Sequence, residues 1–438
     1  MLSIMGRLRT IIVAGSVLLT AACAFGGQPT TTSRALHLGV DLPLSGAEKR
    51  AGIPVLNGVK FFVQRHPTLD GFDVTVVQAD DAAHGRTSPS QGVTNIQGFI
   101  ADPSLVAVIG PLSSGVARKE IPIANFAHLA MVAPATGSQC LTRDVFLDAG
   151  LSPSRTAISC KDAALPPASD LRPTGTNNFF RLTTTDELQG AAAADFAIKT
   201  LHVTRVAAIS DHETYGEGLA AAFTARLQKL GGTVVGHLDA DLKTQPDTTP
   251  FLNGMKGVAA QAIYFAGFDQ GCAIRAQMKA VFDPGESTPF IGADGIALDP
   301  VCAKEAGTNA LGIYGTVPIA YADNLASAAD TIRAFKAAYP GPGDYSPYTM
   351  AGYDAAAVVY AALDRAIHSA GGRLPTRAGV TTEVAATAGL PGITGILGFD
   401  SAGDTTNRVV SIFEAASSDP RGRWKPVTSV DYTAALPY

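Results

Sequence analysis

The stretch RVAAISDHETYGEGLAAAF, residues 205–223, contains residue types that could carry out two kinds of chemistry. Gly216, Gly218 and Ala221 match the G-x-G-x-x-A fingerprint of dinucleotide-binding loops. Just before them, the Asp-His-Glu run at residues 211–213 offers side chains that ligate metals or act as acids and bases. The stretch could therefore be a cofactor loop, an active site, or the mouth of a cleft that only binds a solute.

The position of Gly216 argues against a dinucleotide. In dinucleotide-binding folds the first glycine follows the strand almost directly, so that the helix N-terminus meets the pyrophosphate. Here residues 211–215 separate Ser210 from Gly216, and Asp239 is only a loose candidate for the acid that holds the ribose. We therefore predict that the protein uses no cofactor.

Catalytic and metal-binding motifs are also incomplete. Asp211, His212 and Glu213 are consecutive, so their side chains diverge rather than converge on one ion. The sequence has no H-E-x-x-H and no Walker loop, and GPLSSG and GESTP only approach the G-x-S-x-G of serine hydrolases. We predict no catalytic residue and no metal site. Asp211 and Glu213 are expected in a solvated loop that enters a helix N-terminus, where negative charge is favourable.

The first residues have the pattern of an export signal. Two arginines precede an apolar stretch from Ile11 to Ala22, which is too short to be a comfortable transmembrane helix. The next residue is Cys23, and LTAAC resembles the lipobox of bacterial lipoproteins, with Thr20 in place of the usual aliphatic residue. We predict a signal peptide at 1–22, lipidation of Cys23 and a tether at 23–35. The alternative is an ordinary signal peptide with an incidental cysteine.

Length, charge and cysteine content limit the class of protein. The 438 residues leave 416 after the leader, which is enough for two domains. The formal net charge of −5 becomes −7 when the two leader arginines are removed, which argues against a nucleic-acid partner. Four further cysteines outside the cytosol predict two disulfides, without the C-x-x-C spacing of zinc sites. Of the three possible pairings we favour Cys140 with Cys160 and Cys272 with Cys302.

From Ala35 onward, apolar runs of strand length alternate with helical patterns in two series. The first series contains ALHLGVDL, FDVTVVQAD, SLVAVIG and AMVAPAT. It stops in an insertion at 140–177, which we expect to be an irregular loop stapled by a disulfide. The second series contains RVAAIS, TVVGHLDA, AQAIYFAGF and TPFIGADG. Its order loosens near GIYGTVPIAY; helices follow around 330–339 and 353–369, and RVVSIFE is the last predicted strand. Buried runs separated by helices indicate parallel sheets covered on both faces, and so an α/β protein with two lobes.

Polar and aromatic residues follow the ends of several predicted strands, where open parallel sheets bind their ligands. They are Ser114, Ala135 and Thr136 in the first series and Tyr215, Phe268 and Asp294 in the second. A free helix start with serine hydroxyls binds a carboxylate, and a partly buried aspartate needs a cation such as an α-ammonium. These two halves predict an α-amino acid as the ligand. Ordinary alternatives are packing for the aromatics, helix capping for Ser114 and a turn for Asp294.

Ten motifs together, by their order and spacing, resemble those of one family. They are GVDLPLSG, ADDAA, VIGPLSSGVA, VAPATGS, FFRLTTTDELQG, DHETYGEGLA, YFAGFDQG, FIGADG, YDAAAVVYAALDRA and ITGILGFDSAGD. Over residues 36–412 the chain resembles type I periplasmic binding proteins of the branched-chain amino-acid class, the solute receptors of ABC importers. The resemblance implies two Rossmann-like lobes joined by three crossover strands that act as a hinge. It places lobe one at 36–180 and 319–396, and lobe two at 181–318 and 397–438.

The resemblance also implies a role for each candidate residue. Ser114 and the Ala135-Thr136 segment would receive the ligand carboxylate and ammonium on lobe one. Tyr215 and Asp294 would close over the ligand from lobe two, with Asp294 in the place of the acid that binds the ammonium.

Three departures from the family pattern widen the choice of ligand. Phe268 stands where relatives often have a tyrosine, Ala51 where an aromatic is frequent, and Gly137 where a threonine is expected. Leucine, isoleucine and valine are therefore only one option. A larger or more polar ligand would fit the space left where Ala51 replaces an aromatic side chain.

The predicted function is a receptor, lipid-anchored outside the cytoplasmic membrane, that captures an amino acid or related solute by hinge closure. Bound ligand would favour the closed state because it contacts both lobes. The permease and ATPase of the importer are expected on separate chains, and the receptor is expected to be a monomer. The alternatives are a ligand sensor without a transport role and a secreted amidase-like enzyme, which would need a nucleophile paired with a base.

Overall fold

The computed structural model describes residues 34–149, 156–242, 244–267, 271–282, 288–297, 302, 306–415, 424–434 and 436. The predicted signal peptide, the predicted lipidation site Cys23 and the candidate ligand residue Phe268 lie outside these ranges. Within them, every helix falls short of the length or the apolar character needed to cross a bilayer.

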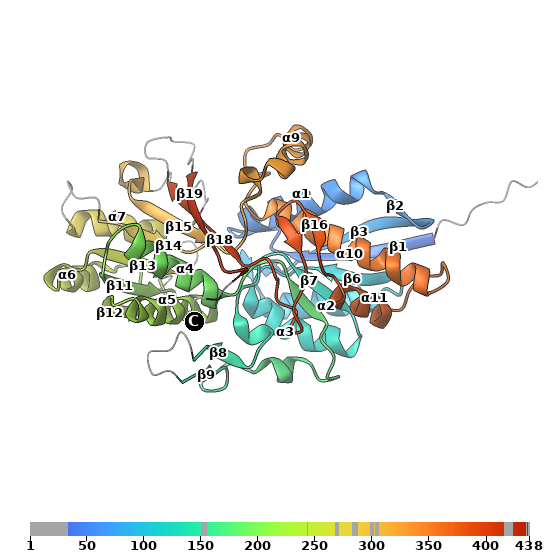
Figure 1. Cartoon of the computed structure of the whole chain (residues 1–438), viewed down its shortest axis with the longest axis horizontal. Helices are drawn as coiled ribbons and strands as arrows, with labels where there is room; N and C mark the ends of the chain where they lie inside the picture. The colour runs from blue at the N-terminus through green and yellow to red at the C-terminus, as the bar shows by residue number, and fades with distance from the viewer. Residues whose placement is uncertain are drawn as a thin grey trace, which may run out of the picture. The chain divides into compact units, whose positions relative to one another are not determined.

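The first sheet has six strands in the order β10-β7-β6-β1-β3-β2 (Figure 1). These are β1 Arg34–Leu42, β2 Thr68–Leu69, β3 Phe72–Asp80, β6 Leu105–Ile109, β7 Ala130–Ala133 and β10 Phe179–Arg181. All neighbouring pairs are parallel except β2 with β3. The central strands β6 and β7 are buried along their whole length, because helices cover both faces of the sheet.

Five helices cover the first sheet. They are α1 Lys49–Arg65, α2 Pro89–Ala101, α3 Ser114–Phe126, α10 Thr349–Ser369 and α11 Arg377–Ala385. Helices α1 and α10 share one core cluster with strand residues such as Leu38, whereas α2 and α3 share another with residues such as Val108. Leu38 and Val108 belong to opposite faces of the sheet. We call this sheet with its five helices lobe one; α11 was not anticipated from the sequence pattern.

The second sheet has seven strands in the order β12-β11-β13-β14-β15-β18-β19. These are β11 Arg205–Ser210, β12 Thr233–Asp239, β13 Ala262–Ala266, β14 Phe290–Gly292, β15 Ile313–Val317, β18 Val409–Ala415 and β19 Trp424–Asp431. The first five strands in this order are parallel, and β18 and β19 extend one end of the sheet as antiparallel strands. The prediction that RVVSIFE is the last strand was wrong, because β19 follows β18 and pairs with it.

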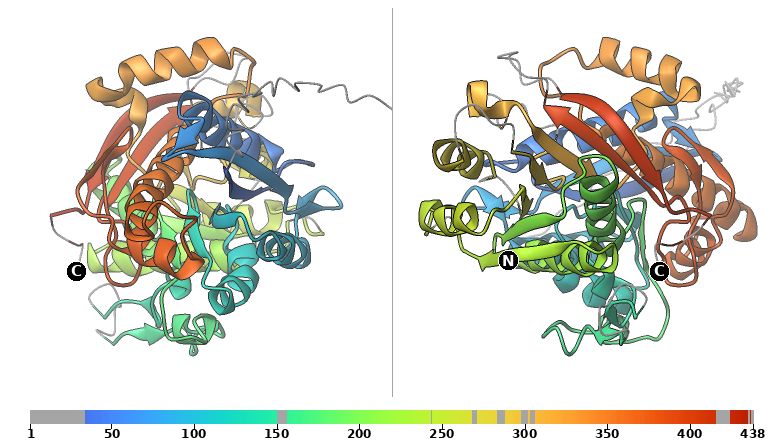
Figure 2. Two further views of the ribbon diagram at one scale, coloured as in Figure 1. Left: turned by 90° about the vertical axis from the view of Figure 1, so that its right-hand side faces the viewer. Right: turned by 60° about the vertical axis from the view of Figure 1, so that its left-hand side comes forward.

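Helices pack on both faces of the second sheet, and the right-hand view of Figure 2 brings this side of the molecule forward. They are α4 Asp186–Lys199, α5 Thr214–Lys229, α6 Thr249–Gly257 and α7 Gly271–Val281. Residues of α4 and α5 share a core cluster with Tyr264, whereas α6 and α7 pack in a cluster with Phe265. Because Tyr264 and Phe265 are adjacent in β13, their side chains point to opposite faces. We call this sheet with these helices lobe two.

Apart from short 3-10 helices, one further α-helix and three strand pairs lie outside the two sheets in the described residues. They are α9 Ala329–Ala338 and the pairs β4 Ala82–Ala83 with β5 Arg86–Thr87, β8 Val145–Leu147 with β9 Ile158–Ser159, and β16 Leu390–Gly392 with β17 Gly395–Leu397. Both predicted disulfides are present, Cys140–Cys160 in the insertion and Cys272–Cys302 in lobe two. The insertion is largely irregular, as expected, but it also contains the small antiparallel pair β8–β9.

The chain passes between the lobes at three places in its described part. The passages follow β10, follow β15 and precede β18, and neighbouring passages contact one another. Thr184 N donates to Pro318 O at 2.9 Å, and Arg181 N donates to Gly403 O at 3.0 Å. The α/β architecture of two Rossmann-like lobes with three crossovers is therefore confirmed.

Candidate functional site

Asp294 is the centre of a polar cluster where the two lobes meet. It lies two residues after β14, so its carboxylate stands at the carboxyl edge of the second sheet. Its Oδ1 accepts hydrogen bonds from Gln189 Nε2 at 2.8 Å and from the Tyr215 hydroxyl. Its Oδ2 accepts one from the Tyr348 hydroxyl at 2.6 Å. Three protein donors therefore orient this carboxylate.

The donors to Asp294 come from both lobes. Gln189 is in the first turns of α4 and Tyr215 is the second residue of α5, both in lobe two. Tyr348 immediately precedes α10, and its ring packs in the core cluster of lobe one. The Asp294 carboxylate is thus a point of direct contact between the lobes.

Asp186, the first residue of α4, is a second carboxyl group in this cluster. It is 1 % exposed, and its Oδ1 has no hydrogen-bond partner among the described residues. Burial raises the pKa of Asp186 well above its usual range, the charge of Asp294 raises it further, and Arg181 acts in the opposite direction. Burying a carboxyl group with an unused acceptor lowers the stability of the fold unless a cation or a proton neutralises the group.

Tyrosine hydroxyls surround the two carboxyl groups. Burial, followed by the charges of Asp294 and Asp186, raises the pKa of Tyr215 and of Tyr348 well above the ordinary value. The same causes raise the pKa of Tyr264, whose hydroxyl has no hydrogen-bond partner in the described structure. All three phenols therefore remain protonated and can act as hydrogen-bond donors.

On lobe one, the predicted residues Ser114 and Thr136 follow the neighbouring strands β6 and β7. Ser114 is the first residue of α3, and its Oγ accepts a hydrogen bond from Ser138 N at 3.3 Å. Thr136 is fully buried, and its Oγ1 has no partner among the described residues. Ala135, beside it, is half-buried. These residues and the N-terminus of α3 can meet an anionic group.

The loop that carries Thr136 is held in place by Arg181. The Arg181 guanidinium donates to Thr136 O at 3.1 Å, to Ser138 O at 2.8 Å and to Asp404 Oδ1 at 2.7 Å. Burial alone would raise the pKa of Asp404, but the charges of Arg181 and Arg143 lower it. Arg181 therefore acts as a buried support, and its donors are used within the protein.

The opening stretch of the sequence has a structural role that differs from the one expected. Asp211 is only 9 % exposed, which contradicts the prediction of a solvated residue. A Cβ on Gly216 would lie 2.2 Å from Asp211 Oδ1, so the glycine of the apparent dinucleotide fingerprint makes room for this carboxylate. Glu213 is exposed and precedes α5, as expected.

The sequence prediction missed Asp186, Gln189, Tyr264 and Tyr348. Asp186 and Gln189 lie in the motif FFRLTTTDELQG, which contributed to the family resemblance but was given no ligand contact. Tyr348 is distant in sequence from all the other site residues, so no local signal connects it with them.

The described residues contain one group of side chains that could hold a metal. Asp70, Asp364 and His368 bring ligand atoms within 4.8 Å of one another at the surface of lobe one. His368 Nδ1 already faces the Asp364 carbonyl oxygen at 2.8 Å. Exposed groups of this kind are common in proteins that bind no metal, so the cluster adds no function.

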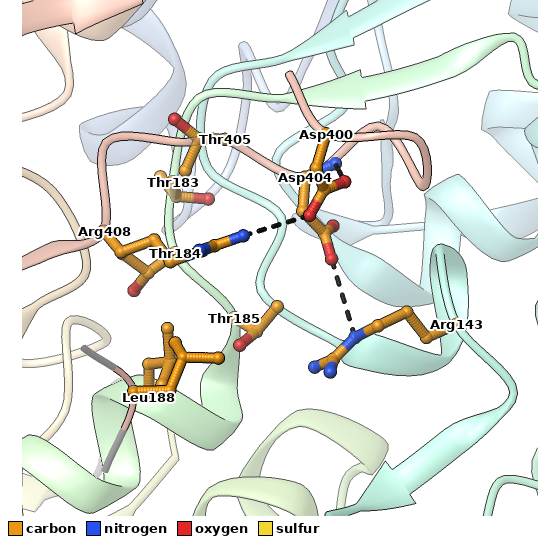
Figure 3. Close-up of a pocket in the computed structure, with 10 residues that line it drawn as sticks. Arg143, Thr183, Thr184, Thr185, Leu188, Asp400, Asp404, Thr405 and Arg408 are labelled. Carbon is orange, nitrogen blue, oxygen red and sulfur yellow. Dashed lines mark hydrogen bonds and ion pairs between the residues drawn. The ribbon is translucent and has the colours of Figure 1, made fainter. Parts of the chain in front are cut away.

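A cavity of about 50 Å³ lies at the crossovers (Figure 3). Three consecutive threonines at 183–185 line it, and their hydroxyls have no partner among the described residues. Arg143 Nε lies 3.6 Å from Asp404 Oδ2, and Arg408 Nη2 lies 3.1 Å from Asp400 Oδ2. The cavity therefore lies where the passage after β10 meets the passage before β18, and its charged side chains pair with one another.

Two lobes, three crossovers and a polar cluster at the facing sheet edges define a type I binding protein, whose activity is to bind a solute. The family model described as periplasmic binding protein matches residues 35–420. The chain therefore belongs to the periplasmic binding protein family.

Known relatives agree with this family. The chain is 28 % identical over 337 residues to the Leu/Ile/Val-binding protein homolog 3 of Brucella melitensis, covering 76 % of this chain and 79 % of that protein. A branched-chain amino acid transporter substrate binding protein of Streptococcus pneumoniae, solved with isoleucine, matches with a TM-score of 0.71 and 19 % identity over 91 % of this chain and 100 % of that one. An ABC transporter solute binding protein of Rhodopseudomonas palustris, solved with p-hydroxybenzoic acid, matches with a TM-score of 0.72 and 17 % identity over 92 % and 98 %.

Proposed function

We propose that this binding protein is the extracytoplasmic receptor of an ABC importer and that it captures an α-amino acid between its lobes. The observation that carries the proposal is the pair of carboxyl groups, Asp186 and Asp294, opposite a helix start that bears Ser114. Two carboxyl groups would bind a cation, whereas the N-terminus of α3 would bind an anion. The names of relatives, such as Leu/Ile/Val-binding protein homolog 3, support a ligand with both charges.

In the proposed complex the two poles of the amino acid bind different lobes. The ligand carboxylate accepts hydrogen bonds from the Ser114 hydroxyl and from the backbone around Ala135 and Thr136. The ammonium lies between Asp294 Oδ2, which accepts only one hydrogen bond from a described donor, and Asp186 Oδ1, which accepts none. Asp186 adds a second acid to the prediction, which had only Asp294 as the acid that binds the ammonium.

Closure of a hinge would couple binding to transport. A ligand that contacts both lobes stabilises the closed state by its differential affinity for that state. We assign the hinge to the three crossovers and keep the lobe boundaries 36–180 with 319–396 and 181–318 with 397–438. Lipidation at Cys23 would hold the receptor outside the cytoplasmic membrane, beside a permease and an ATPase on separate chains.

Isothermal titration calorimetry with a ligand panel tests the proposal. The panel contains α-amino acids, their amides, and carboxylic acids without an amine, including p-hydroxybenzoic acid. We expect heat of binding from at least one α-amino acid and none from acids that lack the amine, because those acids would leave the carboxyl groups of Asp186 and Asp294 without a cation. Binding of p-hydroxybenzoic acid alone, with every amino acid silent, would overturn the ligand assignment.

A further inference from the structure

Tyr348 is the lobe-one residue that contacts the acid of the proposed ammonium site. Its hydroxyl donates to Asp294 Oδ2 at 2.6 Å, and its side chain is 8 % exposed. The ring packs in the core of lobe one, against which α10 begins at the next residue. A rigid aromatic ring anchored in one lobe therefore reaches the carboxylate of the other.

The other donors to Asp294 bind one carboxylate oxygen, and Tyr348 binds the second. Gln189 and Tyr215, both in lobe two, donate to Oδ1. A carboxylate offers about four acceptor positions in total, so these two donors occupy the capacity of Oδ1. Tyr348 occupies one position on Oδ2, which leaves one on the same atom for a ligand.

The hydroxyl of Tyr348 is suited to permanent donation. Burial, and then the charge of Asp294, raises the pKa of Tyr348 well above the ordinary tyrosine value. The phenol therefore keeps its proton over the pH range in which a binding protein works, and the hydrogen bond to Asp294 persists.

We propose that Tyr348 is a positioning residue for the ligand ammonium: it orients Asp294 Oδ2 toward the ligand and, through the same bond, ties lobe one to lobe two in the bound state. This inference rests on the proposed function, because it assigns a role to Tyr348 within the amino-acid site. It predicts that Tyr348 affects the dissociation rate constant of the ligand more than the association rate constant, since the Tyr348–Asp294 hydrogen bond forms as the lobes meet.

The test compares Tyr348→Phe with Tyr360→Phe in the full chain. Tyr360 also lies on α10, and its hydroxyl donates to His66 O at 2.9 Å within lobe one, so this control removes a hydrogen bond of the same lobe away from the site. For the amino acid found by calorimetry, Tyr348→Phe should weaken binding roughly tenfold or more, the range for a hydrogen bond to a charged group. Tyr360→Phe should leave the affinity unchanged.

Kinetics separate positioning from a purely structural role. The single tryptophan, Trp424, packs against the core clusters of both lobes and can report on closure by its fluorescence. Tyr348→Phe should raise the dissociation rate constant and leave the association rate constant nearly unchanged. In an Asp294→Asn background the same substitution should cost much less, even if it lowers the melting temperature.

The outcomes distinguish this inference from the proposed function. If the wild type binds an amino acid and Tyr348→Phe binds it equally well, the role of Tyr348 is wrong and the receptor function stands. If the cost of Tyr348→Phe is the same with and without the Asp294 carboxylate, the inference is likewise overturned. If the wild type binds no amino acid, the function itself fails.

Discussion

Asp186 of lobe two packs directly against Gly137 of lobe one. The Asp186 backbone N donates to Gly137 O at 2.9 Å, and a Cβ on residue 137 would lie 1.7 Å from Asp186 Oδ1. A side chain at position 137 and the present position of this carboxyl group are therefore incompatible. The contact explains the glycine that departs from the family pattern, where a threonine is expected.

Gly137→Ala should consequently weaken binding of the amino-acid ligand. The new methyl group would push the Asp186 carboxyl group away and separate the lobe edges. We expect a loss in affinity of ~1.5–3 kcal/mol, the range for a hydrogen bond that involves charge, because the displaced carboxyl group would no longer meet the ammonium; calorimetry measures this loss. Gly98→Ala on α2 is a suitable control, because nothing lies within 4 Å of a Cβ there. An affinity equal to the wild type in Gly137→Ala would contradict the proposed site.

Neutralising either carboxyl group should weaken ligand binding, and for Asp186 we also predict the effect on stability. Asp294→Asn should weaken amino-acid binding by ~1.5–3 kcal/mol, the range for a hydrogen bond that involves charge. Asp186→Asn should weaken binding similarly, yet leave the free energy of unfolding of the free protein unchanged or higher, because it removes a buried group without a paired charge. Calorimetry and urea denaturation measure the two effects. A large loss of stability in Asp186→Asn would mean that its carboxylate already has a partner in the free protein.

The stability of lobe one should fall as the pH rises. Burial, and then the charges of Asp41, Glu48 and Asp80, raises the pKa of Asp81 from its ordinary value of 3.8 to about 8. Between these values the folded protein holds a proton that the unfolded chain has lost. The free energy of unfolding therefore decreases with rising pH over this window, by about 1.4 kcal/mol per pH unit for one such group, and the loss is complete above pH 8.

Asp81→Asn should flatten this dependence. Urea denaturation at several pH values between 5 and 8 would show a smaller slope than in the wild type. Asp330→Asn, which changes an exposed acid on α9, should leave the slope as it is. An identical slope in Asp81→Asn would show that the carboxyl group titrates normally in the folded state.

The disulfide of lobe two should contribute substantially to stability. Cys272 and Cys302 are 30 residues apart in sequence, and closing a loop of that length restricts the unfolded chain by about 3–4 kcal/mol in the chain-entropy account. Replacing both cysteines by serine should lower the free energy of unfolding by that order, measured by urea denaturation without reductant. Wild-type protein in reductant loses the Cys140–Cys160 bond as well and should be no more stable than the variant. If the serine variant unfolds at the same urea concentration as the oxidised wild type, the Cys272–Cys302 bond adds no stability.

Much of the fold could be predicted from local patterns. Apolar runs such as SLVAVIG and AQAIYFAGF have the length and composition of strands that are buried on both faces, and they became β6 and β13. The order of such runs, with helices between them, requires parallel sheets and hence ligand residues at their carboxyl edges. For this reason Tyr215 and Asp294 are both expected at such strand ends, and the structure brings them into a hydrogen bond.

The errors arose where a residue's role depends on distant parts of the chain. Asp211 looks like a solvated acid in its local sequence, yet it is buried against Gly216 and Gly267. Strand β19 is largely exposed and becomes a strand by pairing with the edge of β18.

The sequence by itself determined the two α/β lobes and the strand-end residues, because these follow from hydrophobic periodicity and short-range spacing; of the three possible cysteine pairings it only favoured the one that the structure contains. Only the tertiary structure decided that Asp186 faces Gly137 and that Tyr348 reaches Asp294. Those contacts join segments that periodicity cannot relate, and they exist because three crossovers bring two independently patterned sheets edge to edge.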